Sequence, residues 1–220
     1  MKPALKRLIT IILSFAVGAA AVIGVIAATR GRLVGYIPGV NYNGGLGVGS
    51  IPSDAADSEL VAASYELLGY IRDSDWRALA AIAHPELGVK FSPYATISAQ
   101  SAKQFTPQAI SAFDKDKTTY VWGVYDGSAE PIEMTPAEYF ARFVFDRDYT
   151  RAPVLGINRV VRSGNALENI AEACPGIRFV DFHLPSPEGE DGAWRSLRLG
   201  FEEYRGSLML TLILHSERTA

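Results

Sequence analysis

The sequence predicts an α+β protein with a single N-terminal transmembrane helix, followed by one domain of helices on a curved antiparallel sheet. The first observation is Leu8–Ala28, a run of 21 residues without a charged side chain. The second is the helical spacing of apolar residues that begins at Ser58, and the third is the alternation of side chains in the strands near the end of the chain. Helices that precede a run of antiparallel strands are typical of the α+β class.

The uncharged run is long enough to cross a membrane. A bilayer core of about 30 Å requires roughly 20 apolar residues in a helix, and Leu8–Ala28 meets that length. The basic residues beside the run are Lys2, Lys6 and Arg7 before it and Arg30 and Arg32 after it. Because basic charge favours the cytoplasmic side, we expect residues 1–7 to be cytoplasmic and the rest of the chain to be exported.

The same segment has a second interpretation, as a cleaved signal peptide. Signal peptides have an apolar region of roughly 7–15 residues that ends at a small-x-small site, and Ala19–Ala21 fits such a site. The apolar run continues to Ile26, however, where a cleavage site would end it. We therefore expect a retained single-pass anchor in the cell membrane, with secretion after cleavage as the alternative.

Composition divides the remainder into a linker and a domain. Residues 29–57 are rich in glycine and predict a tether, and residues 58–220 have the length of one domain. Five of the 21 basic residues and no acidic residue precede Leu33, so the remainder has 16 basic and 24 acidic side chains, a net charge of −8. This charge argues against nucleic acid as a partner. Cys174 is the only cysteine, so no intramolecular disulfide is possible.

The domain begins with two predicted helices. Apolar residues at helical spacing predict a helix over Ser58–Arg72, and a shorter one over Asp75–Ala83 with Ser74 as its cap. The proline at position 85 ends the second helix. Val89–Ile97 is predicted to be extended.

The middle of the domain is predicted from capping and turn signals. Thr106 precedes a proline and predicts a short helix, and Tyr120–Tyr125 is an aromatic and β-branched strand. Thr135 with Glu138 three residues later is a capping box and predicts another helix. Asn165 is expected to cap a further helix.

The end of the domain is predicted to be a sheet. Ile177–Leu184 is a strand, followed by an acidic loop, and Trp194–Tyr204 and Ser207–Ser216 form a hairpin around Arg205-Gly206. The last strand carries apolar residues on both faces, so we expect it to be a central strand covered on both sides.

Two resemblances extend this reading. The order of a helix, the short helix of Asp75–Pro85 and then a sheet is similar to that of NTF2-like (SnoaL-like) domains. This resemblance implies a cone in which helices cover a strongly bent sheet and leave a pocket at its mouth. The chain also resembles a family of uncharacterised exported or membrane-anchored bacterial proteins, which implies no catalytic residues. The segments that carry this second resemblance are His84–Tyr94, Trp122–Ser128, Phe143–Tyr149 and Trp194–Leu199.

Histidines and carboxylates provide the candidates for catalysis. Asp181 and His183 lie two residues apart on one predicted strand, so they share a face, where a carboxylate could orient a general base. His215 lies on the last strand, one face of which would line a cone pocket. The alternative interpretation for each is a structural histidine of the core.

The remaining candidates concern a ligand and a metal. Tyr125, Trp194, Arg195 and Arg198 combine aromatic and polar groups in the manner of a ligand pocket. Asp146 and Asp148 flank an arginine and are the candidates for a metal, although a charged helix end explains them better. No glycine-rich phosphate loop, serine elbow or zinc spacing is present, so the sequence predicts no cofactor.

These observations favour a membrane-anchored extracytoplasmic domain that binds a small ligand or a cell-envelope partner without catalysis. The alternative is an exported enzyme, of isomerase, dehydratase or hydrolase type, that uses a histidine and a carboxylate in a cone pocket. A third possibility is a structural subunit of an envelope complex.

Overall fold

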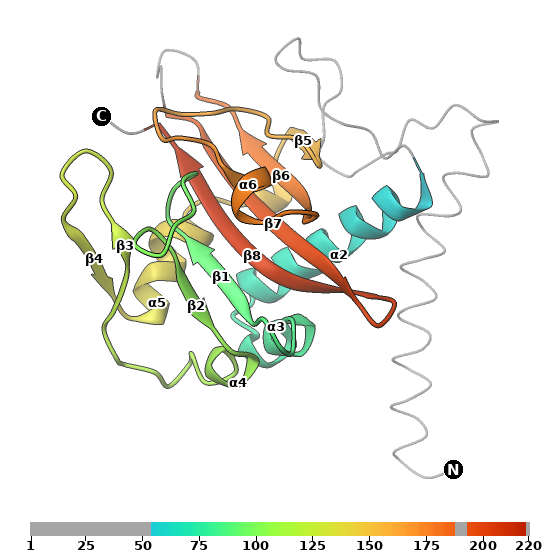
Figure 1. The fold of residues 1–220 in the computed structure, drawn as a ribbon, viewed down its shortest axis with the longest axis horizontal. Coiled ribbons are helices and arrows are strands. Elements are labelled where there is room, and N and C mark those ends of the chain that lie inside the picture. The colour runs from blue at the N-terminus through green and yellow to red at the C-terminus, as the bar shows by residue number, and fades with distance from the viewer. Residues whose placement is uncertain (1–53, 188–192, 219–220) are drawn as a thin grey trace. The chain divides into compact units, whose positions relative to one another are not determined.

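Residues 54–187 and 193–218 are the part of the chain that the structure, a computed structural model, describes. The predicted tail, the anchor Leu8–Ala28 and nearly all of the predicted linker lie outside these residues. No helix within the described ranges is both long and apolar enough to span a bilayer. The described residues form a mixed α+β structure with a curved sheet (Figure 1), which confirms the predicted class.

Two helices open the domain, as predicted, but both starting points differ from the prediction. Helix α2 spans Ala55–Arg72 and begins three residues before Ser58, because the side chain of Asp54 accepts a hydrogen bond from the backbone N–H of Asp57. Helix α3 spans Trp76–Ile82 and is capped by Asp75. The prediction that Ser74 is the cap is wrong, since Ser74 lies in the preceding turn with φ +53°.

Six strands form the main sheet, in the order β2-β1-β8-β7-β6-β5. The strands are β1 (Val89–Ser92), β2 (Lys103–Phe105), β5 (Val154–Ile157), β6 (Arg178–Leu184), β7 (Arg195–Tyr204) and β8 (Ser207–Glu217). All neighbours are antiparallel except β1 and β8, which are parallel. The sheet is therefore mixed rather than purely antiparallel as predicted. Strand β8 is third in the order and is buried along most of its length, which confirms its central position.

Three strands were not predicted. They are β2, β4 (Pro131–Met134) and β5, and strands β2 and β5 are too short to show a clear periodicity. The extended segment predicted over Val89–Ile97 corresponds to β1, which stops at Ser92. Strand β3 (Tyr120–Val124) was predicted, but its antiparallel partner β4 was not. Together β3 and β4 make a separate two-stranded sheet.

Short helices connect the strands. Helix α4 (Pro107–Ile110) begins directly after Thr106, as predicted, and the Thr106 side chain caps it. Helix α5 (Pro136–Tyr139) has the predicted capping box and is followed by a π-helical turn, η1 (Phe140–Val144). A 3₁₀ turn, η2, spans Tyr149–Arg151.

Helix α6 (Ile170–Ala173) starts five residues after Asn165, so the prediction that Asn165 caps it is wrong. Asn169 stands at the N-cap position, but its side chain bonds both the backbone N–H and the carbonyl of Ile97 instead, at 2.8 and 3.0 Å. A contact between residues so far apart in sequence leaves no local signal.

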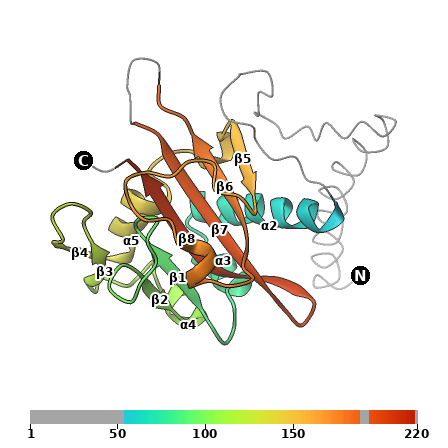
Figure 2. The same cartoon turned by 45° about the horizontal axis from the view of Figure 1, so that its top comes forward.

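The two faces of the main sheet are covered by different helices. On one face Phe182 of β6 meets Tyr65 of α2 edge to face, with ring centroids 5.2 Å apart, and His215 of β8 meets Phe143 of η1. On the other face Ile170 of α6 packs in a cluster with Phe179 and Leu212. Figures 1 and 2 show α2 and α6 on opposite sides of the long strands β7 and β8. We call these the α2 face and the α6 face.

A β-bulge interrupts the pairing of β7 and β8. The adjacent residues Gly200 and Phe201 of β7 pair with Leu212 and Leu210 of β8. Thr211, which lies between these two partners, is therefore the extra residue. The alternation that the sequence shows along β8 therefore does not run unbroken through the strand. Bulges increase the local twist of a sheet, which accounts for the bend visible in Figure 2.

Candidate functional site

A buried ion pair lies on the α6 face. Asp181 of β6 and Arg198 of β7 are direct cross-strand partners, and the Arg198 Nε donates to Asp181 Oδ2 over 3.1 Å. Both side chains have no exposed surface. Because a buried charge is costly without partners, the pair depends on the further hydrogen bonds around it.

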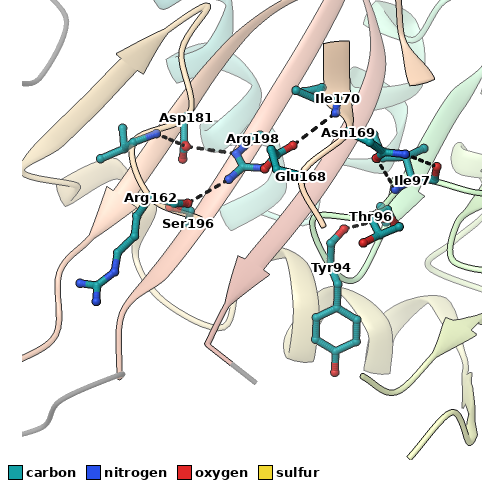
Figure 3. A network of polar contacts seen from close by, with 12 residues as sticks. Tyr94, Thr96, Ile97, Arg162, Glu168, Asn169, Ile170, Asp181, Ser196 and Arg198 are labelled. Atoms are coloured by element: carbon teal, nitrogen blue, oxygen red, sulfur yellow. Dashed lines mark hydrogen bonds and ion pairs between the residues drawn. The ribbon is translucent and has the colours of Figure 1, made fainter. Parts of the chain in front are cut away.

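Segment 161–168 supplies further hydrogen-bond partners for the pair (Figure 3). The backbone N–H of Val161 donates to Asp181 Oδ2, and Arg198 donates to the carbonyl of Arg162 and to the carboxylate of Glu168. Arg198 thereby holds segment 161–168 against the sheet. We call this set of contacts the Arg198 clamp.

His183 lies next to the clamp, on the same face of β6. Its Nδ1 is 2.9 Å from the hydroxyl of Ser196, and its ring lies 5.8 Å from that of Trp194. Burial lowers the pKa of His183, and the nearby charge of Asp181 opposes that shift. Asp181 and His183 thus share a face as predicted, but the Asp181 carboxylate bonds to Arg198 and to a backbone N–H. This geometry does not form the predicted pair of a base and its orienting carboxylate.

A second polar network lies on the α2 face at the end of the sheet. Glu217 of β8 bridges Arg142 of η1, at 2.7 Å, and Arg195 of β7, at 2.9 Å. Arg195 in turn lies 3.3 Å from Asp146. Charges of alternating sign therefore connect η1, β7 and β8.

His215 and Tyr149 complete this network. The Tyr149 hydroxyl donates to Asp146 over 2.7 Å, and His215 Nε2 lies 3.8 Å from the same carboxylate. The other ring nitrogen of His215 lies 3.2 Å from the carbonyl of Pro93, which only accepts, so Nδ1 carries a hydrogen. Burial alone would raise the pKa of Asp146, but His215, Tyr149 and Arg195 outweigh burial and lower it. His215 itself has no exposed surface.

The structure divides the predicted ligand residues. Arg195 belongs to the network on the α2 face, whereas Arg198 belongs to the clamp on the α6 face. Trp194 is 1% exposed, and the Arg162 guanidinium lies over its ring. Tyr125 lies at the end of β3, where its backbone pairs with Glu130. These four residues do not form one pocket.

The two predicted metal candidates also make separate contacts. Asp146 bonds within its network, while Asp148 accepts from the backbone and side chain of Thr150 at the start of η2. Among the described residues there is no group of three potential metal-binding side chains.

A half-open groove of about 340 Å³ lies beside the Arg198 clamp. Its apolar wall is formed by Ile170 and Phe179 of the core cluster on the α6 face and by Val160, which packs against that cluster. Its polar lining residues are Asn158, Glu168, Asn169 and Glu172.

Most of these polar groups already have partners inside the protein. Asn158 accepts from the backbone of Phe179, Asn169 is bonded to Ile97, and Glu168 is bonded to Arg198. Within the part of the chain that the structure describes, the Glu172 carboxylate has no hydrogen bond or ion pair, and the residue is exposed.

Sequence reasoning missed this groove. Its residues come from the turn after β5, from α6 and the two residues before it, and from β6, and no motif connects them. The single available signal was the pair of acids, Glu168 and Glu172, on either side of the start of a helix. Comparisons of the chain with protein-family models, with curated proteins and with solved structures gave no match.

Proposed function

We propose that this protein is a membrane-tethered extracytoplasmic domain that binds a small ligand in the groove beside α6 and does not catalyse a reaction. The groove is the observation that carries the proposal, because a ligand site combines apolar lining residues with polar groups that fix orientation, and both kinds line this groove. Leu8–Ala28 would provide the tether.

The polar candidates support binding over catalysis. Asp181 and Arg198 bond each other with no exposed surface, and His215 is equally buried. A catalytic group must reach the atoms of its substrate. The groove is half open, so a ligand has access to it without rearrangement of either network.

The finer description of the fold belongs to the same proposal. We assign the domain to the NTF2-like cones because two helices precede a bent sheet and α2 covers one of its faces. In this arrangement the groove lies on the opposite face, away from α2.

A substitution that fills the groove tests the binding site. Ala171 is exposed and lines the groove, so Ala171→Trp should obstruct it. Ala62 is exposed on α2, and Ala62→Trp is the matched control. We expect metabolites that raise the melting temperature of the full-length protein to lose this effect with Ala171→Trp and to keep it with Ala62→Trp. A metabolite library without a single stabilising compound would contradict the proposal.

The location has its own test. Protease added to intact cells should degrade the domain, because residues 58–220 are proposed to lie outside the cytoplasmic membrane. A domain that is protected until the cells are lysed would show the opposite orientation.

The second candidate function is an exported enzyme that uses His215. The observation in its favour is the approach of His215 Nε2 to Asp146, with Tyr149 and Arg195 beside them. Histidine paired with a carboxylate is suited to proton transfer. A deletion strain rescued fully by His215→Gln would exclude this function, and the same experiment with His183→Gln tests the other histidine.

A cell-envelope protein is the alternative occupant of the α6 face. Leu167 is 71% exposed next to the groove residue Glu168, which is an unusual position for a large apolar side chain. Cross-linking from position 167 in intact cells should capture a defined partner if this alternative holds.

A further inference from the structure

The charge of the groove indicates the chemical class of its ligand. We propose that the groove binds a small organic cation, an amine or a guanidine with an apolar body, and that Glu172 pairs with the cationic group. This inference rests on the proposed function, since it assumes that the groove is a binding site.

The first step is the charge of the lining. Glu168 and Glu172 are the ionisable residues that line the groove, and no lysine or arginine lines it. Arg198 compensates the charge of Glu168, so the charge of Glu172 is the one that a ligand with a carboxylate or phosphate would meet as like charge, which opposes binding. A cationic ligand would meet attraction.

The second step is the availability of the two carboxylates. Glu168 is occupied, because one oxygen accepts from Arg198 and the other from the backbone N–H of Ile170. Glu172 keeps its hydrogen-bonding capacity, since among the described residues its carboxylate has no partner. Recognition of a cation without loss of the Arg198 clamp thus falls to Glu172.

The third step is the wall opposite the charge. Phe179 and Ile170, at 7% and 4% exposed, form the buried floor of the groove, whereas the lining residues Val160 and Ala171 are half-buried and exposed. A ligand that covers Val160 and Ala171 gains the free energy of burying apolar area, which inorganic cations cannot. The ligand should therefore carry a hydrocarbon or aromatic body as well as its charge.

Three small molecules of similar shape and different charge test this inference. We would titrate 2-phenylethylamine, 2-phenylethanol and phenylacetate into the full-length protein in detergent, with protein-free micelles as the reference. Isothermal calorimetry gives the affinities, and the Ala171→Trp variant shows whether binding is in the groove. We expect the amine to bind most tightly and phenylacetate least tightly.

Variants at two glutamates show whether Glu172 is responsible. Glu172→Gln should weaken binding of the amine about two- to fivefold, the range for a solvent-exposed ion pair, and leave the alcohol unchanged. Glu133→Gln removes an exposed charge on β4 and should change neither. Unchanged binding of the alcohol also shows that the Glu172→Gln variant is folded.

The possible failures are distinct. Equal affinities for the three molecules, or an amine affinity that Glu172→Gln does not change, would overturn the inference about charge and leave the groove as a binding site. If none of the three molecules binds in a manner sensitive to Ala171→Trp, the inference is overturned and the proposed function loses its site as well.

Discussion

The substitution Arg198→Met is the most demanding test of the α6 face. Methionine keeps much of the volume of arginine and removes its charge. The variant leaves Asp181 without its ion-pair partner in a position with no exposed surface. It also removes the hydrogen bonds that hold segment 161–168 at Arg162 and Glu168.

The expected magnitude follows from the burial of the pair. Removal of one partner of a buried ion pair costs about 3–5 kcal/mol, because the other charge remains buried and unpaired. Asp181 Oδ1 already lacks a hydrogen-bond partner within the described residues, so the site has no spare donor to compensate. A loss of this size is a large part of the roughly 5–15 kcal/mol by which domains are stable.

A double-mutant cycle separates the charge from the packing. Asp181→Asn removes the charge that Arg198→Met leaves unpaired, so the double variant should be less destabilised than the two single losses combined, with a coupling of about 1–3 kcal/mol. The assay is denaturant unfolding of the full-length protein, followed by circular dichroism.

A matched control uses an arginine outside the network. Arg147 is exposed, and Arg147→Met should change the free energy of unfolding by about 0.5 kcal/mol or less. A loss below about 1 kcal/mol for Arg198→Met, or strict additivity in the cycle, would refute the argument that the clamp is a buried, interdependent network.

Three further predictions concern pH and backbone packing. The pKa of Asp146 is lower in the folded protein than in the unfolded chain, so the ionised carboxylate adds to the free energy of unfolding above the unfolded pKa. This added stability is lost as the pH falls through the folded pKa, and Asp146→Asn should therefore flatten the acid limb of a plot of stability against pH. The pKa of His183 is also lowered, so NMR titration should show its ring protonating below the ordinary value of about 6.5, and stability should decrease as the pH falls below that value. Gly156→Ala would bring a Cβ into the backbone carbonyl of Arg159 and should lower the free energy of unfolding by about 1–3 kcal/mol. Gly69→Ala in α2 places its Cβ in open space and should raise the free energy of unfolding by about 0.5–1 kcal/mol. Chemical denaturation of both variants checks the contrast.

Local signals predicted the elements whose cause is local. The capping box of Thr135 and Glu138 starts α5 because both hydrogen bonds form within four residues. The hairpin at Arg205-Gly206 follows from two adjacent residues that adopt positive φ. Strand β8 was correctly predicted to be central because both of its faces are apolar.

Long-range contacts determined what could not be predicted. Asn169 stands at the start of α6, but its side chain bonds Ile97 rather than capping the helix. Strand β5 owes its existence to β6, since four residues alone carry too little pattern. The groove joins residues from three elements, and its position depends on how the segment after β5 folds back over the sheet.

For the candidate site residues, too, local pattern predicted one feature and long-range contacts determined the rest. Alternation along one strand predicted that Asp181 and His183 share a face. The partner of Asp181 is Arg198, however, and the register between β6 and β7 decides that pairing. Arg195 and Arg198 are three positions apart on β7 and therefore enter different networks on opposite faces. Residue type identified groups that carry charge, but only the register showed which of them neutralise one another.

Glu168 belongs both to the buried Arg198 clamp and to the lining of the groove. Its carboxylate bonds Arg198, which holds segment 161–168 on the sheet, and the same residue lines the groove. A cation that took Glu168 from Arg198 would have to compensate for the weakened clamp, whereas a cation that pairs with Glu172 displaces no existing contact. If the groove binds a cation as proposed, the energetics of the clamp favour Glu172 over Glu168 as its partner, because pairing with Glu172 leaves in place the contacts that hold segment 161–168 on the sheet.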